Sequence, residues 1–140
     1  MREINIYTDG GARGNPGPAA VGVYIVDEDN KEIASIGRKI GNATNNVAEY
    51  SAILEALSWI IENIEKLQEV TKIIFFLDSL LVCSQIKGLY KVKNRDLREM
   101  VFKVREKEAE IKKQIFYKHI PREQNRKADS LVNMALDNNL

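Results

Sequence analysis

Apolar and polar residues alternate along the first part of the chain in the manner of extended strands. This pattern predicts strands over residues 3–9, 20–27 and 31–40. Residues 10–18 form a glycine- and proline-rich stretch, which we expect to be a loop, and a short polar turn separates the second strand from the third. Short polar connections are typical of antiparallel neighbours, so the pattern predicts a three-stranded meander.

Helical spacing dominates the rest of the chain. Apolar positions recur every three to four residues from Tyr50 to Ile64, which predicts a helix capped by Asn45 or Asn46 and continuing to about Lys66. The unbroken apolar run over residues 72–77 predicts a strand that is buried on both faces. The remaining expected elements are helices over residues 79–87, 93–113 and 126–136, and a strand over residues 114–120.

The predicted order, βββαβααβα, defines an α/β fold. Three antiparallel strands and two later parallel strands would form a mixed five-stranded sheet with helices on both faces. A chain of 140 residues is long enough for one domain, so we expect residues 1–140 to form a single unit. In open α/β sheets, sites lie beyond the carboxyl ends of parallel strands, and Asp9 and Asp78 each end such a predicted strand.

Acidic residues stand at the edges of otherwise apolar elements. They are Asp9, Glu49, Asp78 and Asp129. A carboxylate at the end of a strand is costly to desolvate unless a positive charge lies nearby. Carboxylates are hard oxygen ligands that suit Mg²⁺, and two such ions can bind both the attacking water and the leaving oxygen of a phosphodiester. The four acids therefore predict a site for divalent cations.

Each acid also has an ordinary structural explanation. Asp78 can cap the helix that follows it, and Glu49 has the spacing of a capping box with Asn46. Asp129 can be a first-turn acid that the helix dipole favours. Asp9 has the weakest alternative, because a Gly-Gly turn needs no acid before it. Together the four positions favour a metal site over four separate explanations.

Composition and the absence of other motifs exclude several further classes of function. The net charge is +1, so any binding of nucleic acid requires a local basic face. Cys83 is the only cysteine, and no apolar run has the length of a membrane span, so we expect a cytoplasmic protein. The chain has no Cys/His cluster for zinc, no phosphate-binding loop of the G-x-x-x-x-G-K-[ST] type and no nucleophile elbow.

Four segments, in this order and at these intervals, make the chain resemble type 1 ribonuclease H, also called ribonuclease HI. They are residues 7–18 (YTDGGARGNPGP), 44–49 (TNNVAE), 77–79 (LDS) and 121–129 (PREQNRKAD). The family cuts the RNA strand of RNA–DNA hybrids with two Mg²⁺ ions, for which Mn²⁺ often substitutes, and leaves 5′-phosphate and 3′-hydroxyl ends. The resemblance implies that the four acids are its catalytic metal ligands.

The resemblance also implies substrate contacts. Asn15 and Thr44 would hold a phosphate of the DNA strand, whereas Asn45 and Asn46 would face the minor groove. The expected set is completed by Gly10, Gly11 and Ser79. Such contacts suit recognition by groove shape, phosphates and 2′-hydroxyls rather than by base sequence. Turn and cap roles for Asn15 and Asn45 are compatible with this function.

The chain departs from the family in its substrate-binding residues. Leu80 stands where many members have Gln, and the basic insertion between the two middle helices is absent, as in archaeal-like members. The cations near that position are Lys87, Lys91, Lys93, Arg95 and Arg98. They are explained either as a solvated face or as a reduced grip on the DNA strand. We expect weaker and more salt-sensitive binding than in members that have the insertion.

A further departure concerns the histidine that many members place in the loop before the fourth acid. His119 falls at the end of the last predicted strand, where a structural role explains it as well as a catalytic one. Arg122 lies in the loop itself and can hold phosphate oxygens in a bidentate manner. We therefore expect Arg122, rather than His119, to assist catalysis.

Three functions are compatible with these residues. The first is a metal-dependent endoribonuclease on RNA–DNA hybrids, acting as a monomer without an obligate protein partner, with double-stranded RNA open as a second substrate. The second is a non-catalytic module that binds hybrids or double-stranded RNA, but a binder has no use for four mutually repelling carboxylates beside a polyanion. The third is a transposase-like strand-cutting enzyme, against which the small size and residues 44–46 argue.

Overall fold

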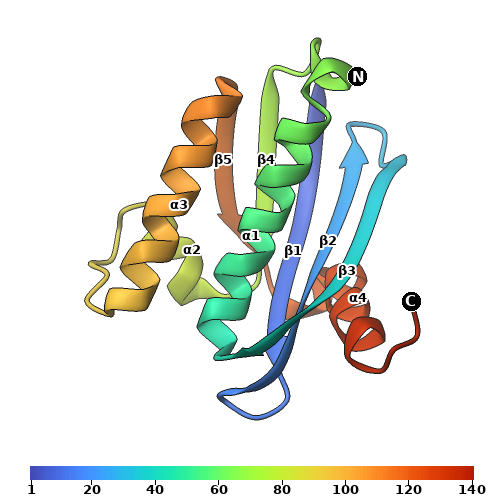
Figure 1. The fold of residues 1–140 in the computed structure, drawn as a ribbon. Helices are drawn as coiled ribbons and strands as arrows, with labels where there is room; N and C mark the ends of the chain where they lie inside the picture. The colour runs from blue at the N-terminus through green and yellow to red at the C-terminus, as the bar shows by residue number, and fades with distance from the viewer.

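The computed structural model describes residues 1–140 and centres on a five-stranded sheet in the order β3-β2-β1-β4-β5 (Figure 1). The strands are β1 (Glu3–Ala12), β2 (Gly17–Asp27), β3 (Glu32–Ala43), β4 (Lys72–Leu77) and β5 (Gln114–His119). The pairs β1–β2 and β2–β3 are antiparallel, whereas β1–β4 and β4–β5 are parallel. The predicted mixed sheet is therefore confirmed.

Helices cover both faces of this sheet (Figure 1). They are α1 (Asn45–Glu62), α2 (Leu80–Ile86), α3 (Arg95–Ile111) and α4 (Arg126–Leu136), with short 3₁₀ turns η1 (Ile64–Leu67) and η2 (Arg122–Gln124). On one face α1 packs against β1 with α3 beside it, and on the other α4 packs against β2, β3 and β1. No helix combines the length and apolar character needed to cross a bilayer.

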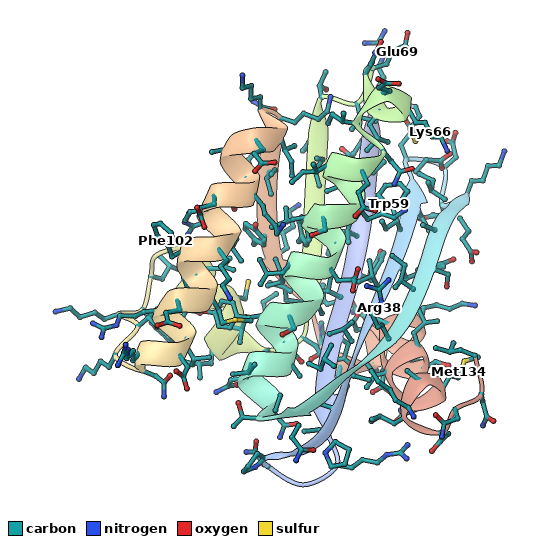
Figure 2. All side chains as sticks on the ribbon, viewed as in Figure 1. Arg38, Trp59, Lys66, Glu69, Phe102 and Met134 are labelled. Carbon is teal, nitrogen blue, oxygen red and sulfur yellow. The ribbon has the colours of Figure 1, made fainter.

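The main core lies between the sheet and the α1–α3 layer. Twenty-one buried residues form it, among them Ile6 of β1, Ile53 and Leu57 of α1, and Phe75 of β4. A small second cluster of Ala20, Val132 and Ala135 lies under α4. Figure 2 shows side chains filling the space between α1, α3 and the sheet, whereas the labelled Phe102 projects from the outer side of α3.

The apolar periods of the sequence account for this core. The four α1 positions Tyr50, Ile53, Leu57 and Ile60 have no exposed surface, as expected for one face of a helix. The run in β4 buries Ile73, Ile74 and Phe75 in succession, so this strand is buried on both faces as predicted.

The first strand is longer than the sequence predicts, because the Gly10–Gly11 pair is not a turn. Residues 10–12 continue the ladder opposite Val21, Ala20 and Ala19 of β2. A Cβ atom on Gly10 would lie 2.1 Å from the carbonyl oxygen of Ala48, so the glycine serves the close approach of α1. Asp9 consequently lies within β1 rather than at its end. Asp9 nevertheless comes directly after Thr8, which forms with Leu77 the last parallel pair of β1 and β4.

Helix ends differ from the prediction in which polar residue caps them. Thr44, rather than Asn45 or Asn46, caps α1, and its Oγ1 accepts from the N–H of Val47 at 3.2 Å. This removes the capping-box explanation for Glu49. Ser79, rather than Asp78, caps α2 by accepting from the N–H of Val82 at 3.2 Å. Both acids are thereby free of a capping role.

Other boundaries also shift, by up to four residues: β2 spans Gly17–Asp27, β3 spans Glu32–Ala43 and α2 spans Leu80–Ile86. The α1 helix ends at Glu62 and is followed by a 3₁₀ turn, instead of continuing to Lys66. The α3 helix begins at Arg95 after its cap Asn94 and ends before Lys112, whose left-handed backbone (φ 56°) terminates it. The β5 strand ends at His119, one residue earlier than predicted.

Candidate active site

Three of the four predicted acids converge at one end of the sheet. Asp9 of β1, Glu49 of α1 and Asp78, which directly follows β4, each offer a ligand oxygen, and these oxygens lie within 4.8 Å of one another. Asp9 is 7% exposed and Glu49 is 6% exposed. A set of nearly buried carboxylates at this distance is a geometry in which several oxygens can bind one cation.

The backbone explains how these acids meet. Asp9 and Asp78 come directly after the last pair of the parallel β1–β4 ladder, so they lie side by side, Asp9 within β1 and Asp78 just beyond β4. Glu49 reaches them because Gly10 lets the backbone of α1 lie directly against β1 at Ala48. The expectation that the acids gather at the carboxyl ends of parallel strands is confirmed for this trio.

Asp129 of α4 lines the same cleft but stands outside this group of three. It lies in the first turn of α4, as its alternative explanation requires, and its charge also acts on Asp9. The backbone of α4 lies directly against β2 at this point. A Cβ atom on Gly22 would lie only 2.1 Å from the carbonyl oxygen of Ala128, the residue before Asp129. Gly22 is the residue paired with Asp9 across the β1–β2 ladder, so α4 meets the sheet beside Asp9.

The carboxylates are electrostatically strained. Burial raises the pKa of Asp9 to about 7, the charges of Asp78 and Asp129 add to this effect, and the hydrogen bond with Glu49 opposes it. Burial, followed by the charge of Asp9, raises the pKa of Glu49 well above its ordinary value. The Oε2 atom of Glu49 is buried without a hydrogen-bond partner. No ion pair of the structure involves any of these acids.

This combination fits a divalent cation. Buried oxygens without partners and mutually repelling charges are unfavourable in the protein alone, and a bound cation relieves both. The donors are all carboxylate oxygens, which suit Mg²⁺ and Mn²⁺ better than softer ions.

Most other predicted site residues surround the acids. A cleft of about 370 Å³ contains Gly10, Gly11, Asn45, Asn46, Ser79 and Arg122 in addition to the four acids. Arg122 enters it from the turn η2. His119 is exposed at the end of β5 and does not line the cleft. Arg13 and Asn133 also line it and were not expected to. Arg13 belongs to the segment 7–18 but had no assigned role, and Asn133 lies outside the four segments.

A neighbouring hollow contains the residues expected to hold phosphate. It is lined by Asn15, Thr44, Asn45 and Asn46, together with Asn94 and Asp96 at the start of α3. Asn15 Oδ1 accepts from the N–H of Asn45, and Asn45 Oδ1 accepts from the N–H of Ala12, both at 2.9 Å. The sequence pattern places Asn94 inside the helix predicted over residues 93–113, so its place in this hollow was not predicted.

One polar residue of the site was missed altogether. Asn125 is 1% exposed, and its amide Nδ2 donates to Thr8 O at 2.8 Å and to Asp78 Oδ2 at 3.0 Å. In the sequence this residue is only an asparagine before a helix, and nothing in the pattern indicates where its side chain points.

Comparisons with known proteins agree with this geometry. The family described as Reverse transcriptase-like matches residues 7–135. Ribonuclease HI of Halobacterium salinarum is 38% identical, over 96% of this chain and 64% of its own length. A bifunctional protein of Mycobacterium tuberculosis is 36% identical over 96% of this chain. The chain spans only 36% of the length of that relative.

Solved structures show the same likeness. LC11-RNase H1, isolated from compost by a metagenomic approach, superposes with a TM-score of 0.93 at 44% identity, covering 99% of this chain and 98% of its own. The same protein in complex with an RNA/DNA hybrid superposes with a TM-score of 0.90 at 42% identity, covering 96% of this chain and 97% of its own. With the matching order of elements and the trio of acids, these similarities show that the chain belongs to the type 1 ribonuclease H family.

Proposed function

We propose that this protein is an endoribonuclease that hydrolyses the RNA strand of RNA–DNA hybrids with two divalent cations and leaves 5′-phosphate and 3′-hydroxyl ends. The observation that carries this proposal is the cluster of Asp9, Glu49 and Asp78. Asp9 and Glu49 are buried, none of the three forms an ion pair, and all three line a polar cleft. The complex of LC11-RNase H1 with an RNA/DNA hybrid supports the choice of substrate.

Asp9, Glu49, Asp78 and Asp129 would hold the cations, Mg²⁺ or its substitute Mn²⁺. When bound, the cations would supply positive charge for the attacking water, the phosphate and the leaving 3′-oxygen. Before binding, the raised pKa values of Asp9 and Glu49 keep protons on this pair near neutral pH. Binding would therefore displace protons from the pair, because a cation favours the ionised carboxylates.

The residues of the neighbouring hollow favour contact with an acceptor-rich ligand. The side-chain oxygens of Asn15, Thr44 and Asn45 already accept backbone N–H groups of the protein. Their amide and hydroxyl hydrogens are left to donate outward. Phosphate oxygens, 2′-hydroxyls and minor-groove base edges all accept hydrogen bonds, so these donors suit a DNA phosphate and the minor groove of a hybrid.

Within the cleft, the other polar groups would orient the RNA strand. We assign the backbone of Gly10 and Gly11 and the side chains of Asn46 and Ser79 to contacts with the sugars and phosphates beside the acids. Arg122 is the cationic side chain of the η2 turn in the cleft, and its guanidinium would hold the phosphate that is cut. His119 lies outside the cleft, which favours Arg122 for this role.

We further propose that residues 1–140 act as a single catalytic domain and as a monomer. All strands belong to one sheet, and every helix packs against it or against α1. The only cysteine, Cys83, is free and buried. This is consistent with our proposal that the protein acts in the reducing cytoplasm.

The test uses end-labelled RNA–DNA hybrid beside single-stranded RNA, double-stranded RNA and double-stranded DNA. Each is incubated with the protein in Mg²⁺, Mn²⁺ or EDTA, and the product ends are mapped. We expect metal-dependent cutting of the RNA strand of the hybrid, with 5′-phosphate ends. Binding without cutting in either metal would replace the proposal by a non-catalytic hybrid-binding module. Cutting of the DNA strand would indicate the transposase-like alternative.

A further inference from the structure

Asn125 is the most deeply buried amide side chain beside the acids. It precedes α4 and occupies the N-cap position of that helix, yet its side chain makes no capping hydrogen bond. Instead its Nδ2 donates both to the carbonyl oxygen of Thr8 and to Oδ2 of Asp78, at 2.8 Å and 3.0 Å. Its own Oδ1 is buried without a partner.

The other three helices of the chain have the side-chain capping hydrogen bond that α4 lacks. Thr44, Ser79 and Asn94 each accept an N–H of the first helical turn with the side-chain oxygen, at 3.2, 3.2 and 3.0 Å. In an N-cap the side-chain oxygen is the useful atom, because the free groups at a helix start are N–H donors. Asn125 uses only its donors, and these point away from α4. Helix capping therefore does not explain why an asparagine stands here.

The position of its partners gives a better explanation. Thr8 and Leu77 form the last parallel pair of β1 and β4, and Asp9 and Asp78 follow immediately. The amide of Asn125 thus joins β1 to the Asp78 carboxylate at the point where backbone pairing stops. The main chain of Asn125 also accepts from the N–H of Asp129, at 3.1 Å. One buried residue therefore contacts two of the acids and the residue before a third.

We propose that Asn125 is a positioning residue for the acid cluster, an inference that rests on the proposed function. Its amide holds one oxygen of Asp78 and ties that carboxylate to β1 beside Asp9, which leaves the other Asp78 oxygen for a cation. A carboxylate that is fixed by a hydrogen bond loses less freedom when it binds a metal, and it keeps its orientation during the reaction.

The test compares Asn125→Ser and Asn125→Ala with the wild type. Serine caps helices as well as asparagine does, but its side chain is shorter and its hydroxyl cannot reach both Thr8 O and Asp78. Asn63→Ala is the matched control, because the Asn63 amide also donates to a backbone carbonyl, that of Trp59 at 2.8 Å, at the far end of α1. For each protein we would measure Mn²⁺ binding by calorimetry without substrate, kcat and KM on the hybrid, and urea unfolding.

Both Asn125 variants should bind Mn²⁺ about 10–100-fold more weakly than the wild type, the usual effect of removing a partner that orients a metal ligand. Their kcat should fall while KM stays unchanged, and high Mn²⁺ should partly restore kcat. Asn63→Ala should lower only the resistance to urea and leave Mn²⁺ binding, kcat and KM unchanged. Wild-type Mn²⁺ affinity and kcat in Asn125→Ser would overturn the proposal and leave Asn125 as a helix-start residue.

Failure of the proposed function is distinguishable from failure of this inference. If the wild type cuts no hybrid, the proposed activity is wrong, and the calorimetry still decides whether Asn125 orients Asp78 for a cation. If Asn125→Ala does not fold, Asn125→Ser carries the measurement, since serine is a favourable residue at a helix start and adds no charge.

Discussion

The two ends of the β1–β4 pair are buried to a similar degree but by opposite chemistry. At one end Ile4, Ile6, Ile73 and Phe75 have no exposed surface and belong to the main apolar core. At the other end Asp9 is 7% exposed, beside an equally enclosed Glu49 with an unpaired oxygen. The apolar end stabilises the fold, whereas the ionised acidic end opposes folding until a cation neutralises its charge.

Stability and the proposed function therefore depend on different residues of the same pair of strands. A sequence selected for stability alone would not bury an unpaired carboxylate cluster beside a sheet. We therefore expect changes at the acidic end to cost activity and spare the fold, and changes at the apolar end to do the reverse.

The largest expected effect is that of Asp9→Asn on cleavage. Removing one charged ligand should lower the rate on the hybrid by about 10³-fold, the scale seen when a key electrostatic group is lost from an active site. In EDTA at neutral pH the variant should be at least as stable as the wild type, because repulsion with Asp78 and Asp129 is relieved. Cleavage assays and urea unfolding measure the two effects. Unchanged turnover would show that the metal site is assigned wrongly.

The second prediction concerns pH without metal. The pKa of Asp9 is raised from 3.8 to about 7 in the folded protein, so the folded state binds the proton more tightly than the unfolded state. The resulting stabilisation is fully present below about pH 4 and is lost as the pH rises to about 7, by about 4 kcal/mol if Asp9 titrates alone.

Urea unfolding in EDTA at several pH values, with Asp9→Asn as the reference, isolates this contribution from that of other groups. Mg²⁺ should restore stability at pH 7–8, where the carboxylates are ionised. A difference between the wild type and the variant that does not change with pH would contradict the assignment.

The third prediction tests the apolar core to which the apolar end of the strand pair belongs. Ile53→Ala on α1 removes a side chain with no exposed surface and should lower the free energy of unfolding by about 3 kcal/mol. Ile53 lies one helical turn beyond Glu49, so this variant changes the core next to a proposed metal ligand without changing the ligand itself. At a temperature where the variant stays folded, kcat on the hybrid should match the wild type. A loss of kcat would mean that core packing and carboxylate geometry are coupled.

The smallest expected effect separates Arg122 from His119. Arg122→Ala should slow cleavage about tenfold, the value of one charge-assisted hydrogen bond at an exposed position. His119→Ala should have less effect, because His119 does not line the cleft. Single-turnover rates in saturating Mg²⁺ compare the two, and the reverse order would transfer the role to His119.

The sequence predicted the fold where one physical effect dominates. The bounds of β4 and α4 were predicted to the residue, because an unbroken apolar run and an amphipathic face leave little freedom. The prediction failed where several effects meet. Gly10 fits a turn as well as a close helix–strand approach, and Thr44, Asn45 and Asn46 are three consecutive capping residues. Only the packed structure distinguishes these possibilities.

The site shows the same division. The acids could be predicted because a carboxylate in an apolar setting is unusual in itself. Asn125 could not be, since asparagine before a helix is ordinary and its role depends on contacts with Thr8 and Asp78, which are distant in sequence. Asn94 was missed because the helix was predicted to begin at residue 93, before the true start at Arg95.

The close contacts at Gly10 and Gly22 have a consequence for redesign of the site. Each of these strand residues faces the backbone of a helix immediately before an acid, Ala48 before Glu49 and Ala128 before Asp129. One methyl group at either glycine would act as a spacer that pushes the whole helix outward and carries its carboxylate away from Asp9. The width of the cation site, and with it the choice between a smaller and a larger ion, can thus be adjusted by substitutions at residues that never touch the ion.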